Sequence, residues 1–255
     1  MTALVIRDFE AAIADYLQVP STNVLVCNSG SSALFVTLLA TIKPGELVIT
    51  SPFTFPATVN AIILAGGIPV FVDIGENYQL DLELVKKHAA EYNVETVVWP
   101  TLFQKPMLEI SEQLPFEIIE DAAQCFFPSK NKNVTFRTFS FYKTKRLSTF
   151  EGGAIYCKDY LDIARLGGII NQGQQYPGEF VSIGLNFRMS EILAQIGLEA
   201  LKTKRFNLTE KQPEDGYYDY VIQDLRYMKD YDYIDTGTPK ARETALKIKE
   251  KKWKK

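Results

Sequence analysis

The sequence predicts an α/β protein with three layers, in which helices cover both faces of a mostly parallel sheet. Short apolar segments alternate with longer amphipathic ones along most of the chain. The apolar segments are continuous, as in Leu47-Val-Ile-Thr50, which is typical of strands covered on both faces. The length of 255 residues and the 46% hydrophobic content are ordinary for one large domain with a sizeable core.

The expected elements follow one another in a regular order. Strands are expected at residues 24–27, 47–50, 69–73, 96–99, 116–120 and 154–157. Helices are expected at residues 31–42, 55–65, 80–92, 161–166 and 188–202, with a loop rich in Gly, Gln and Asn at 167–184. Beyond about residue 205 the sequence becomes polar and rich in tyrosine, which indicates a domain boundary there.

Composition narrows the class of protein. The net charge of −3 gives no reason to expect a nucleic-acid partner, and the lysines of the last ten residues are interpreted as a solvated helix end. Cys27, Cys125 and Cys157 show no CxxC spacing and lie in apolar segments, so we expect buried thiols in a reducing compartment. No run approaches the roughly 20 apolar residues of a membrane span. We therefore expect a cytoplasmic protein without a membrane partner.

One segment, Asn28-Ser-Gly-Ser-Ser-Ala-Leu34, follows an expected strand and opens an expected helix. In such a turn, backbone N–H groups and the helix dipole favour a phosphate. Gly30 allows a close approach of the backbone, while Ser31 and Ser32 add hydroxyl donors. No Gly-Lys-Ser/Thr follows, which excludes a nucleoside-triphosphate loop. A serine-rich helix cap without a ligand explains this segment alone equally well.

Two further strand ends carry groups that suit a planar heterocycle. Ser51-Pro-Phe-Thr-Phe-Pro-Ala-Thr58 places two aromatic residues after a strand, where an aromatic face can meet a flat ring, although core packing is the commoner role. Glu120-Asp-Ala-Ala-Gln124 ends another strand. A carboxylate there can keep a pyridinium nitrogen protonated, or it can cap the next helix.

The stretch 139–153 places the hydroxyl of Ser140 five residues before the amine of Lys145. These two groups can hold pyridoxal 5'-phosphate, because the amine forms a Schiff base with the aldehyde and the hydroxyl binds the phosphate. Together with the three segments above, all at the carboxyl ends of strands, they supply every contact that this cofactor requires. No His/Cys cluster suggests a metal, and His88 is expected on the surface of a polar helix face.

These segments, in this order, resemble the DegT/DnrJ/EryC1/StrS family of pyridoxal-phosphate sugar aminotransferases, which have the aspartate-aminotransferase fold (fold type I). The resemblance spans residues 28 to about 200. Its segments are 28–34, 52–58, 67–73, 120–124, 139–153 and 185–192. It implies a large cofactor-binding domain over residues 1–205 and a truncated C-terminal small domain over residues 206–255.

The resemblance implies roles around the cofactor ring. Lys145 would form the Schiff base, and Asp121 would pair with the pyridine nitrogen; both are the expected catalytic residues. Phe55 would stack on the ring, and Gln124 would lie beside its phenolic oxygen. Lysine at this position keeps the transamination route, whereas some family members place histidine there and act as dehydratases. Lys143 is a rival amine, but the spacing from the serine favours Lys145.

The resemblance also implies how the phosphate is held. Gly30, Ser31 and Ser140 would bind it, with Ser32 as a further hydroxyl donor of the same turn. Asn186, in the family's Asn-Tyr/Phe-Arg motif, would reach the phosphate of the neighbouring subunit. We therefore expect a homodimer with shared active sites.

The expected function is transfer of an amino group, with glutamate as donor, to a nucleotide-linked keto-sugar, giving an amino sugar for glycan or polysaccharide biosynthesis. Two alternatives stay open. One is a catalytically weak homologue that binds the cofactor or partner proteins and has a regulatory role. The other is a different pyridoxal-phosphate reaction on an amino acid. Thr101-Leu-Phe-Gln104 departs from the family's usual His-Leu-Tyr/Phe-Gly turn, and Phe150 stands where glycine is more usual.

Overall fold

The computed structural model describes residues 4–75, 78–206, 228 and 230–244, and every structural statement below concerns these residues. The helices are α1 (Leu4–Leu17), α2 (Gly30–Thr41), α3 (Pro56–Leu64), α4 (Leu82–Tyr92), α5 (Leu161–Ile170) and α6 (Glu191–Lys202), with a short 3-10 helix at Ser21–Asn23. The strands are β1 (Val24–Cys27), β2 (Leu47–Thr50), β3 (Ile68–Phe71), β4 (Thr96–Pro100), β5 (Glu117–Asp121), β6 (Val134–Ser140), β7 (Gly153–Cys157), β8 (Gln174–Tyr176), β9 (Glu179–Phe180) and β10 (Ile234–Asp235).

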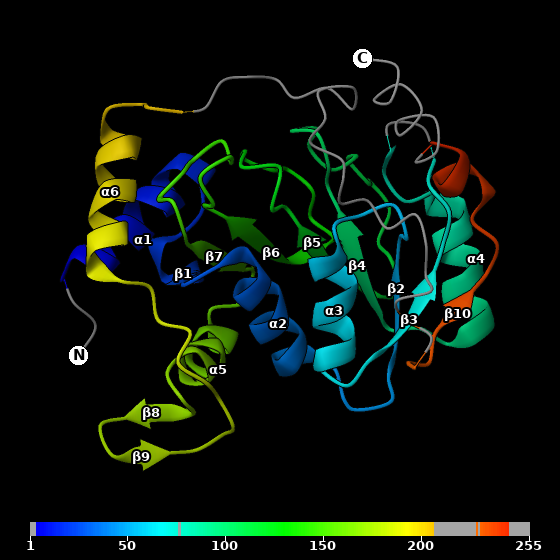
Figure 1. Cartoon of the computed structure of the whole chain (residues 1–255), viewed down its shortest axis with the longest axis horizontal. Helices are drawn as coiled ribbons and strands as arrows, with labels where there is room; N and C mark the ends of the chain where they lie inside the picture. The colour runs from blue at the N-terminus through cyan, green and yellow to red at the C-terminus, as the bar shows by residue number, and fades with distance from the viewer. Residues whose placement is uncertain (1–3, 76–77, 207–227, 229, 245–255) are drawn as a thin grey trace.

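Eight of these strands form one sheet in the order β1-β7-β6-β5-β4-β2-β3-β10 (Figure 1). Only β7 runs against its neighbours, so the expectation of a mostly parallel sheet is confirmed. Because β7 is antiparallel to both β1 and β6, these two strands point the same way as the rest. The carboxyl ends of β1, β2, β4, β5 and β6 therefore lie at a single edge of the sheet.

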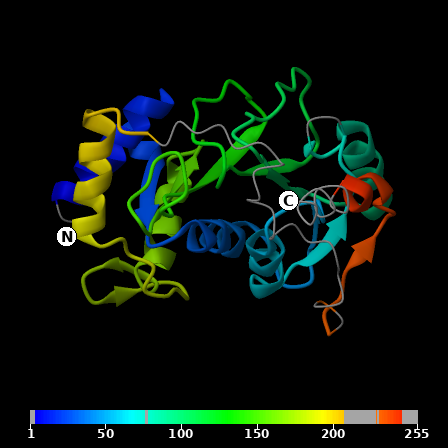
Figure 2. The same ribbon diagram turned by 45° about the horizontal axis from the view of Figure 1, so that its top comes forward.

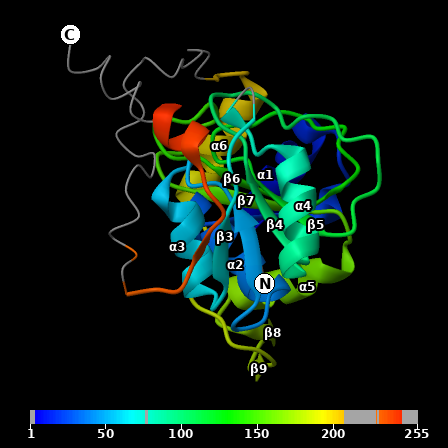
Figure 3. The same ribbon diagram turned by 90° about the vertical axis from the view of Figure 1, so that its right-hand side faces the viewer.

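Helices cover both faces of the sheet. Neighbouring residues of one strand point to opposite faces, so Val98 packs in the cluster of α2, α3 and α5, while Val97 packs in that of α4. Figure 3, which views the sheet from its β3 end, shows α3 and α4 on opposite sides. Figures 1 and 2 show α1 and α6 side by side at the β1 end, with β10 at the far end. The predicted three-layer architecture is confirmed.

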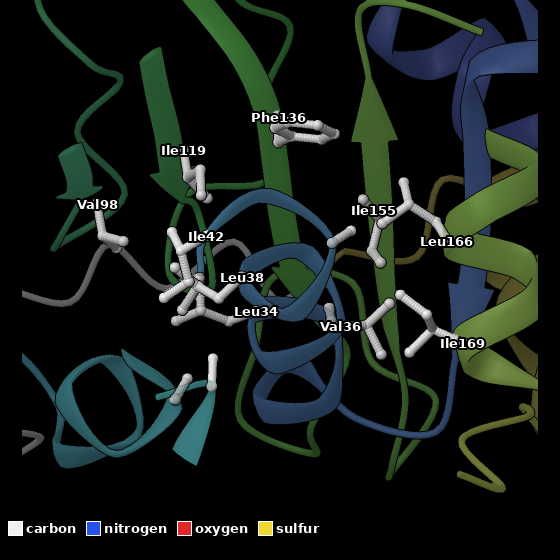
Figure 4. Close-up of a cluster of buried hydrophobic side chains, with 14 of the residues drawn as sticks. Leu34, Val36, Leu38, Ile42, Val98, Ile119, Phe136, Ile155, Leu166 and Ile169 are labelled. Carbon is white, nitrogen blue, oxygen red and sulfur yellow. The ribbon is translucent and has the colours of Figure 1, made fainter. Parts of the chain in front are cut away.

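Helix α2 is apolar around most of its circumference and therefore lies deep in the core. In Figure 4, Leu34 and Leu38 lie on the side of α2 toward Val98 and Ile119, and the same buried cluster includes Ile169 of α5. Burying each such leucine contributes about 2 kcal/mol. At its amino end, the Ser29 hydroxyl accepts a hydrogen bond from the Ser32 N–H at 3.0 Å. The core thus fixes the start of α2 at the carboxyl edge of the sheet.

The expected strands and helices are present, with shifts of a few residues at their ends. The sequence did not predict β6, because Arg137 and two threonines interrupt the apolar pattern there. Arg137 is nevertheless buried, since it forms an ion pair with Glu120 of β5. The loop expected at 167–184 contains the β8–β9 hairpin. The helix expected from residue 188 begins at Glu191.

The expectation that His88 lies on the surface is wrong. His88 is only 8% exposed, and its ring stacks on that of Tyr92 with 6.0 Å between centroids. It follows the buried Val85 by three residues, so both side chains project to the same side of α4. The imidazole Nδ1 lies 3.1 Å from Glu91 Oε2 at the helix margin. Because histidine is polar, the sequence pattern did not reveal that position 88 faces the core.

The three cysteines are buried and unbridged, as expected. Burial raises the pKa of the Cys27, Cys125 and Cys157 thiols to about 12. No described helix combines the length and apolarity that crossing a bilayer requires. The boundary expected after residue 205 is followed by residues 207–227, which lie outside the described part, as does the lysine-rich tail. From the region beyond this boundary, β10 joins the main sheet beside β3.

Candidate active site

The turn before α2 is pressed against the ends of two neighbouring strands. A Cβ atom on Gly30 would lie 2.6 Å from Ser140 Cβ, and one on Gly153 would lie 2.4 Å from the Ser29 carbonyl oxygen. Real Cβ atoms do not approach this closely, so both positions require glycine. The backbone N–H groups at the start of α2 are thereby brought beside the Ser140 hydroxyl. This arrangement fits a phosphate group, which is bound by helix N-termini and hydroxyl donors.

The three serines of this turn have different surroundings. Ser29 caps α2, and its hydroxyl lies 2.8 Å from that of Ser32. Ser31 is exposed, whereas Ser32 is half-buried. The cap interpretation of the segment is therefore correct for Ser29. It does not compete with anion binding, because the backbone N–H groups of the first helical turn need partners beyond a single cap.

Asp121 ends β5 in the same edge of the sheet. Its Oδ2 accepts a hydrogen bond from the Thr58 hydroxyl at 2.7 Å, and its Oδ1 accepts one from the Ala123 N–H at 3.2 Å. Burial raises the pKa of Asp121, and the Thr58 hydroxyl, the Ala123 N–H and the positive charge of Lys145 oppose that rise. The last contribution means that Lys145 and Asp121 are close enough to interact. A desolvated carboxylate of this kind suits a buried cationic partner such as a pyridinium N–H.

Lys145 lies in the compact connection between β6 and β7. Its backbone N–H donates to the Tyr142 carbonyl at 2.8 Å, and the Lys143 N–H donates to the Phe150 carbonyl at 3.0 Å. Lys145 is half-buried, whereas Lys143 is exposed and places its ammonium over the Tyr142 ring. The geometry therefore favours Lys145 over Lys143 as the amine of the site.

Gln124 follows Asp121 by three residues and is tied to another turn. Its Oε1 accepts a hydrogen bond from the Phe103 N–H at 3.2 Å. Gln124 Nε2 is the donor end of the same amide, which matches a phenolate oxygen as partner. The Phe103 ring packs against those of Phe53 and Tyr78, with centroids 6.3 and 4.9 Å away.

A buried ion pair lies on the other face of the sheet from Asp121. Arg137 Nε donates to Glu120 Oε2 at 2.6 Å, and Arg137 Nη1 donates to the Phe127 carbonyl at 3.0 Å. Glu120 also accepts from the Thr101 hydroxyl at 3.1 Å. Arg137 therefore links both ends of the turn that carries Asp121 and Gln124.

Two further predicted residues lie on exposed segments. Phe55 immediately precedes α3 and is 45% exposed, so part of its ring is open to a ligand. Asn186 is exposed on the segment from β9 to α6, where its backbone bridges to Asn171. The structure brings Gly30 against Ser140 and Lys145 near Asp121. The segment of Asn186 reaches the turn before α2, because the carbonyl of the next residue, Phe187, accepts a hydrogen bond from the Asn28 N–H at 2.8 Å.

Sequence reasoning missed several residues of the site. Thr58 lies in the expected aromatic turn, and the spacing of four residues between the hydroxyls of Thr54 and Thr58 is a signal that could have identified it. Ser29 had the ordinary signature of a helix N-cap. Phe103 and Arg137 gave no signal, because their roles depend on contacts with Gln124 and Glu120 across the sheet.

Comparisons with known proteins agree with this fold. The chain matches the model of the DegT/DnrJ/EryC1/StrS aminotransferase family over residues 4–249. It is 27% identical over 248 residues to a UDP-4-amino-4,6-dideoxy-N-acetyl-beta-L-altrosamine transaminase of Campylobacter jejuni, covering 89% of this chain and 65% of that protein. It is 30% identical over 241 residues to GDP-perosamine synthase of Caulobacter vibrioides, covering 86% and 62%.

Solved structures show the same fold. Helicobacter pylori PseC, an aminotransferase involved in the biosynthesis of pseudoaminic acid, matches with a TM-score of 0.71 and 27% identity over 79% of this chain and 58% of that one. NtdA from Bacillus subtilis, with bound cofactor PMP, matches with a TM-score of 0.70 and 25% identity, covering 79% and 48%. This chain spans less than two thirds of the length of these curated relatives. It belongs to the DegT/DnrJ/EryC1/StrS aminotransferase family.

Proposed function

We propose that this chain binds pyridoxal 5'-phosphate and transfers an amino group, with glutamate as donor, to a nucleotide-linked keto-sugar. The observation that carries the proposal is the set of groups at one sheet edge: a glycine turn against Ser140, and Lys145 near the buried Asp121. Family membership and relatives named as sugar transaminases support the reaction class. When bound, the cofactor supplies an electron sink for the substrate carbon that loses its proton.

Each proposed residue has a task that its surroundings suit. The Lys145 amine would hold the cofactor covalently and, once displaced by the amino donor, would move a proton to or from the substrate carbon. The Asp121 carboxylate, kept in place by Thr58, would hold the proton on the ring nitrogen. The Gln124 amide would donate toward the phenolic oxygen. Phe55 would stack on the ring.

The phosphate would be held by Ser140 and by the turn of Gly30, Ser31 and Ser32. A phosphate at this turn meets the positive end of the α2 dipole. The negative ligand therefore lies at one end of the site and the cationic ring nitrogen at the other, beside Asp121. This polarity gives the cofactor a single orientation.

We also propose a homodimer in which Asn186 of one subunit completes the site of the other. The support is a series of exposed large apolar side chains on and after the β8–β9 hairpin, since exposed apolar groups that gather on one segment often mark protein–protein contacts. They are Tyr176, Phe180, Val181, Ile183, Leu185 and Ile192. Asn186 directly follows Leu185 and is exposed.

The test of the cofactor site is the visible absorption that pyridoxal phosphate acquires when a lysine amine holds it. The wild-type protein should show this band, Lys145→Ala should abolish it, and Lys143→Ala should keep it as the matched control. Added glutamate should then bleach the band as the amino group is transferred. A wild-type protein that shows no band with the cofactor supplied would sink the proposal, and a band that glutamate leaves unchanged would favour the cofactor-binding alternative.

Mixing two inactive variants tests the shared site. If Asn186 acts in the partner's site, chains carrying Lys145→Ala and chains carrying Asn186→Ala should form mixed dimers with one intact site, and activity should reappear on mixing. If Asn186 acts within its own subunit, no mixed dimer contains an intact site. Continued inactivity of demonstrably mixed dimers would therefore refute the shared arrangement.

A further inference from the structure

The segment 234–244 is bound to the main domain at the end of the sheet beside β3. β10 pairs in parallel with β3, and the Thr236 hydroxyl donates to the Phe71 carbonyl at 2.8 Å. β10 and β3 are far apart in the sequence, so their pairing is a long-range contact that no local pattern specifies. Figure 1 shows β10 and the short helical turn after it along the β3 end of the sheet.

Asp73 fastens the helical turn 239–244 to the sheet. Its Oδ2 accepts a hydrogen bond from the Lys240 N–H at 2.8 Å, and its Oδ1 accepts one from the Ala241 N–H at 2.7 Å. Asp73 is 6% exposed and lies just beyond the carboxyl end of β3. Hydrogen bonds from N–H groups to a buried carboxylate are stronger than neutral ones. The turn is therefore held at the same sheet edge as the candidate site.

The helical turn 239–244 shares an apolar cluster with the loop that orients Gln124. Ala241 is 2% exposed and belongs to one apolar cluster with Phe53, Leu102 and Phe103. Phe103 in turn donates its N–H to Gln124 Oε1. A continuous series of contacts thus runs from Asp73 to Ala241, through the apolar cluster that Ala241 shares with Phe103, to Gln124.

The loop between them has an unfavourable backbone. Phe103 and Gln104 have φ angles of 61° and 56°, in the left-handed region that glycine prefers. Two consecutive side-chain-bearing residues hold this conformation only when their surroundings impose it. The packing of Phe103 against Phe53 and Ala241 is an interaction that does so.

We propose that the segment 234–244 is a brace of the active site, which holds the Phe103–Gln104 backbone in its left-handed conformation and thereby fixes the orientation of the Gln124 amide. The role of Gln124 in this statement rests on the proposed cofactor site, whereas the brace itself does not. Asp73 and Ala241 are positioning residues, because they act on the site only through Phe103.

Hydrogen–deuterium exchange of the full-length protein without cofactor tests the brace directly. Ala241→Gln, which places a longer polar side chain at a closed position, should speed exchange in residues 101–106 about tenfold, the equivalent of one lost hydrogen bond and its packing. Exchange in residues 28–32 should not change. Lys240→Gln is the matched control, because Lys240 is exposed and binds Asp73 through its backbone alone.

Pyridoxal phosphate titration of the same variants tests the consequence. Its dissociation constant should rise about three- to tenfold in Ala241→Gln and stay at the wild-type value in Lys240→Gln. If Ala241→Gln does not fold, Asp73→Asn replaces it. The Lys240 and Ala241 N–H groups bond to different oxygens of Asp73, and asparagine has only one oxygen that can accept them. Adding Gln104→Gly to Ala241→Gln should slow the exchange of residues 101–106 again, because glycine adopts the left-handed backbone without strain.

The outcomes separate this proposal from the proposed function. Equal exchange in residues 101–106 of Ala241→Gln and Lys240→Gln would overturn the brace, whatever the cofactor does. Faster exchange with an unchanged dissociation constant would overturn the link to Gln124. A wild-type protein that does not bind pyridoxal phosphate would overturn the proposed function, while the exchange experiment would still decide on the brace.

Discussion

The two sides of the candidate site are built in different ways. On the first side, the turn of Ser29 and Gly30, Ser140 and Asp121 stand at strand ends, and the regular sheet brings them together. On the second side, Gln124 is oriented by a loop with left-handed residues, which packs against a segment from the far end of the chain. The groups of the first side stand at the ends of regular strands. The second side contains residues with positive φ angles, which packing against the segment 234–244 keeps in place.

This difference predicts how strongly substitutions on each side affect stability. The first side depends on close backbone approaches and on buried charges beneath the strand ends, so single changes there should alter the free energy of unfolding by about 1–5 kcal/mol. The second side depends on packing at the surface, so changes there should be smaller and should alter local opening more than global stability. The predictions below test this ranking, from the largest effect to the smallest.

Arg137→Met should have the largest effect. It leaves Glu120 as a buried charge without its partner, which typically costs about 3–5 kcal/mol of unfolding free energy. Urea unfolding measures this loss. The double variant Glu120→Gln/Arg137→Met should recover most of it, because no uncompensated charge remains. A loss below about 1 kcal/mol in Arg137→Met would contradict the ranking, since that is the value of an exposed pair.

Glu10 makes the first side sensitive to pH. Its Oε1 accepts a hydrogen bond from the Val26 N–H of β1 at 3.0 Å. Burial raises the pKa of Glu10 to about 7, although the Val26 N–H and the charge of Arg7 oppose the rise. Between about pH 4.5 and 7 the folded state therefore holds more protons than the unfolded state, and its stability falls as pH rises through this window.

Glu10→Gln keeps an acceptor for Val26 and cannot ionise. At pH 8 it should be more stable than the wild type by on the order of 3 kcal/mol, and the gap should close as the pH falls toward 4.5. Urea unfolding at the two pH values measures the gap. A difference that does not change with pH would show that ionisation of Glu10 has no part in it.

Gly153→Ala should separate the turn of Ser29 and Gly30 from β7. Its Cβ would meet the Ser29 carbonyl oxygen at 2.4 Å, so the backbone must shift, at a cost of about 1–3 kcal/mol. Pyridoxal phosphate should also bind less tightly, because the N–H groups at the start of α2 move. Gly75→Ala is the control, since its nearest neighbour would be 3.5 Å away. Equal stability of the two variants would refute the close approach.

Gln104→Gly should have the smallest effect, and of opposite sign. Glycine relieves the left-handed strain at φ 56° but adds freedom to the unfolded chain, so a net gain of roughly 0.5–1 kcal/mol is expected. Thermal unfolding measures it. Gln174→Gly in β8, where no such strain exists, should instead be destabilising. If both variants lose stability equally, the second side is not strained.

Much of the first side was predictable because its signals are local. A strand followed by Ser29 and Gly30, and a strand ending at Asp121, can be recognised from neighbouring residues alone. The β6 strand escaped prediction because Arg137 is polar until its partner Glu120 is known. The surface position predicted for His88 was wrong because histidine is polar, and only the elements that pack on α4 decide which of its sides faces the core. The roles assigned to the individual site residues stay predictions.

The sequence by itself determined the order of most strands and helices, the family, and the residue types gathered at the carboxyl edge of a parallel sheet. It did so because apolar periodicity, helix caps and glycine turns act over a few residues. Only the tertiary structure decided which groups meet across the sheet: Arg137 with Glu120, Thr58 with Asp121, and Ala241 with Phe103. Such contacts join residues distant in the chain, and their strength depends on burial, which no local pattern specifies.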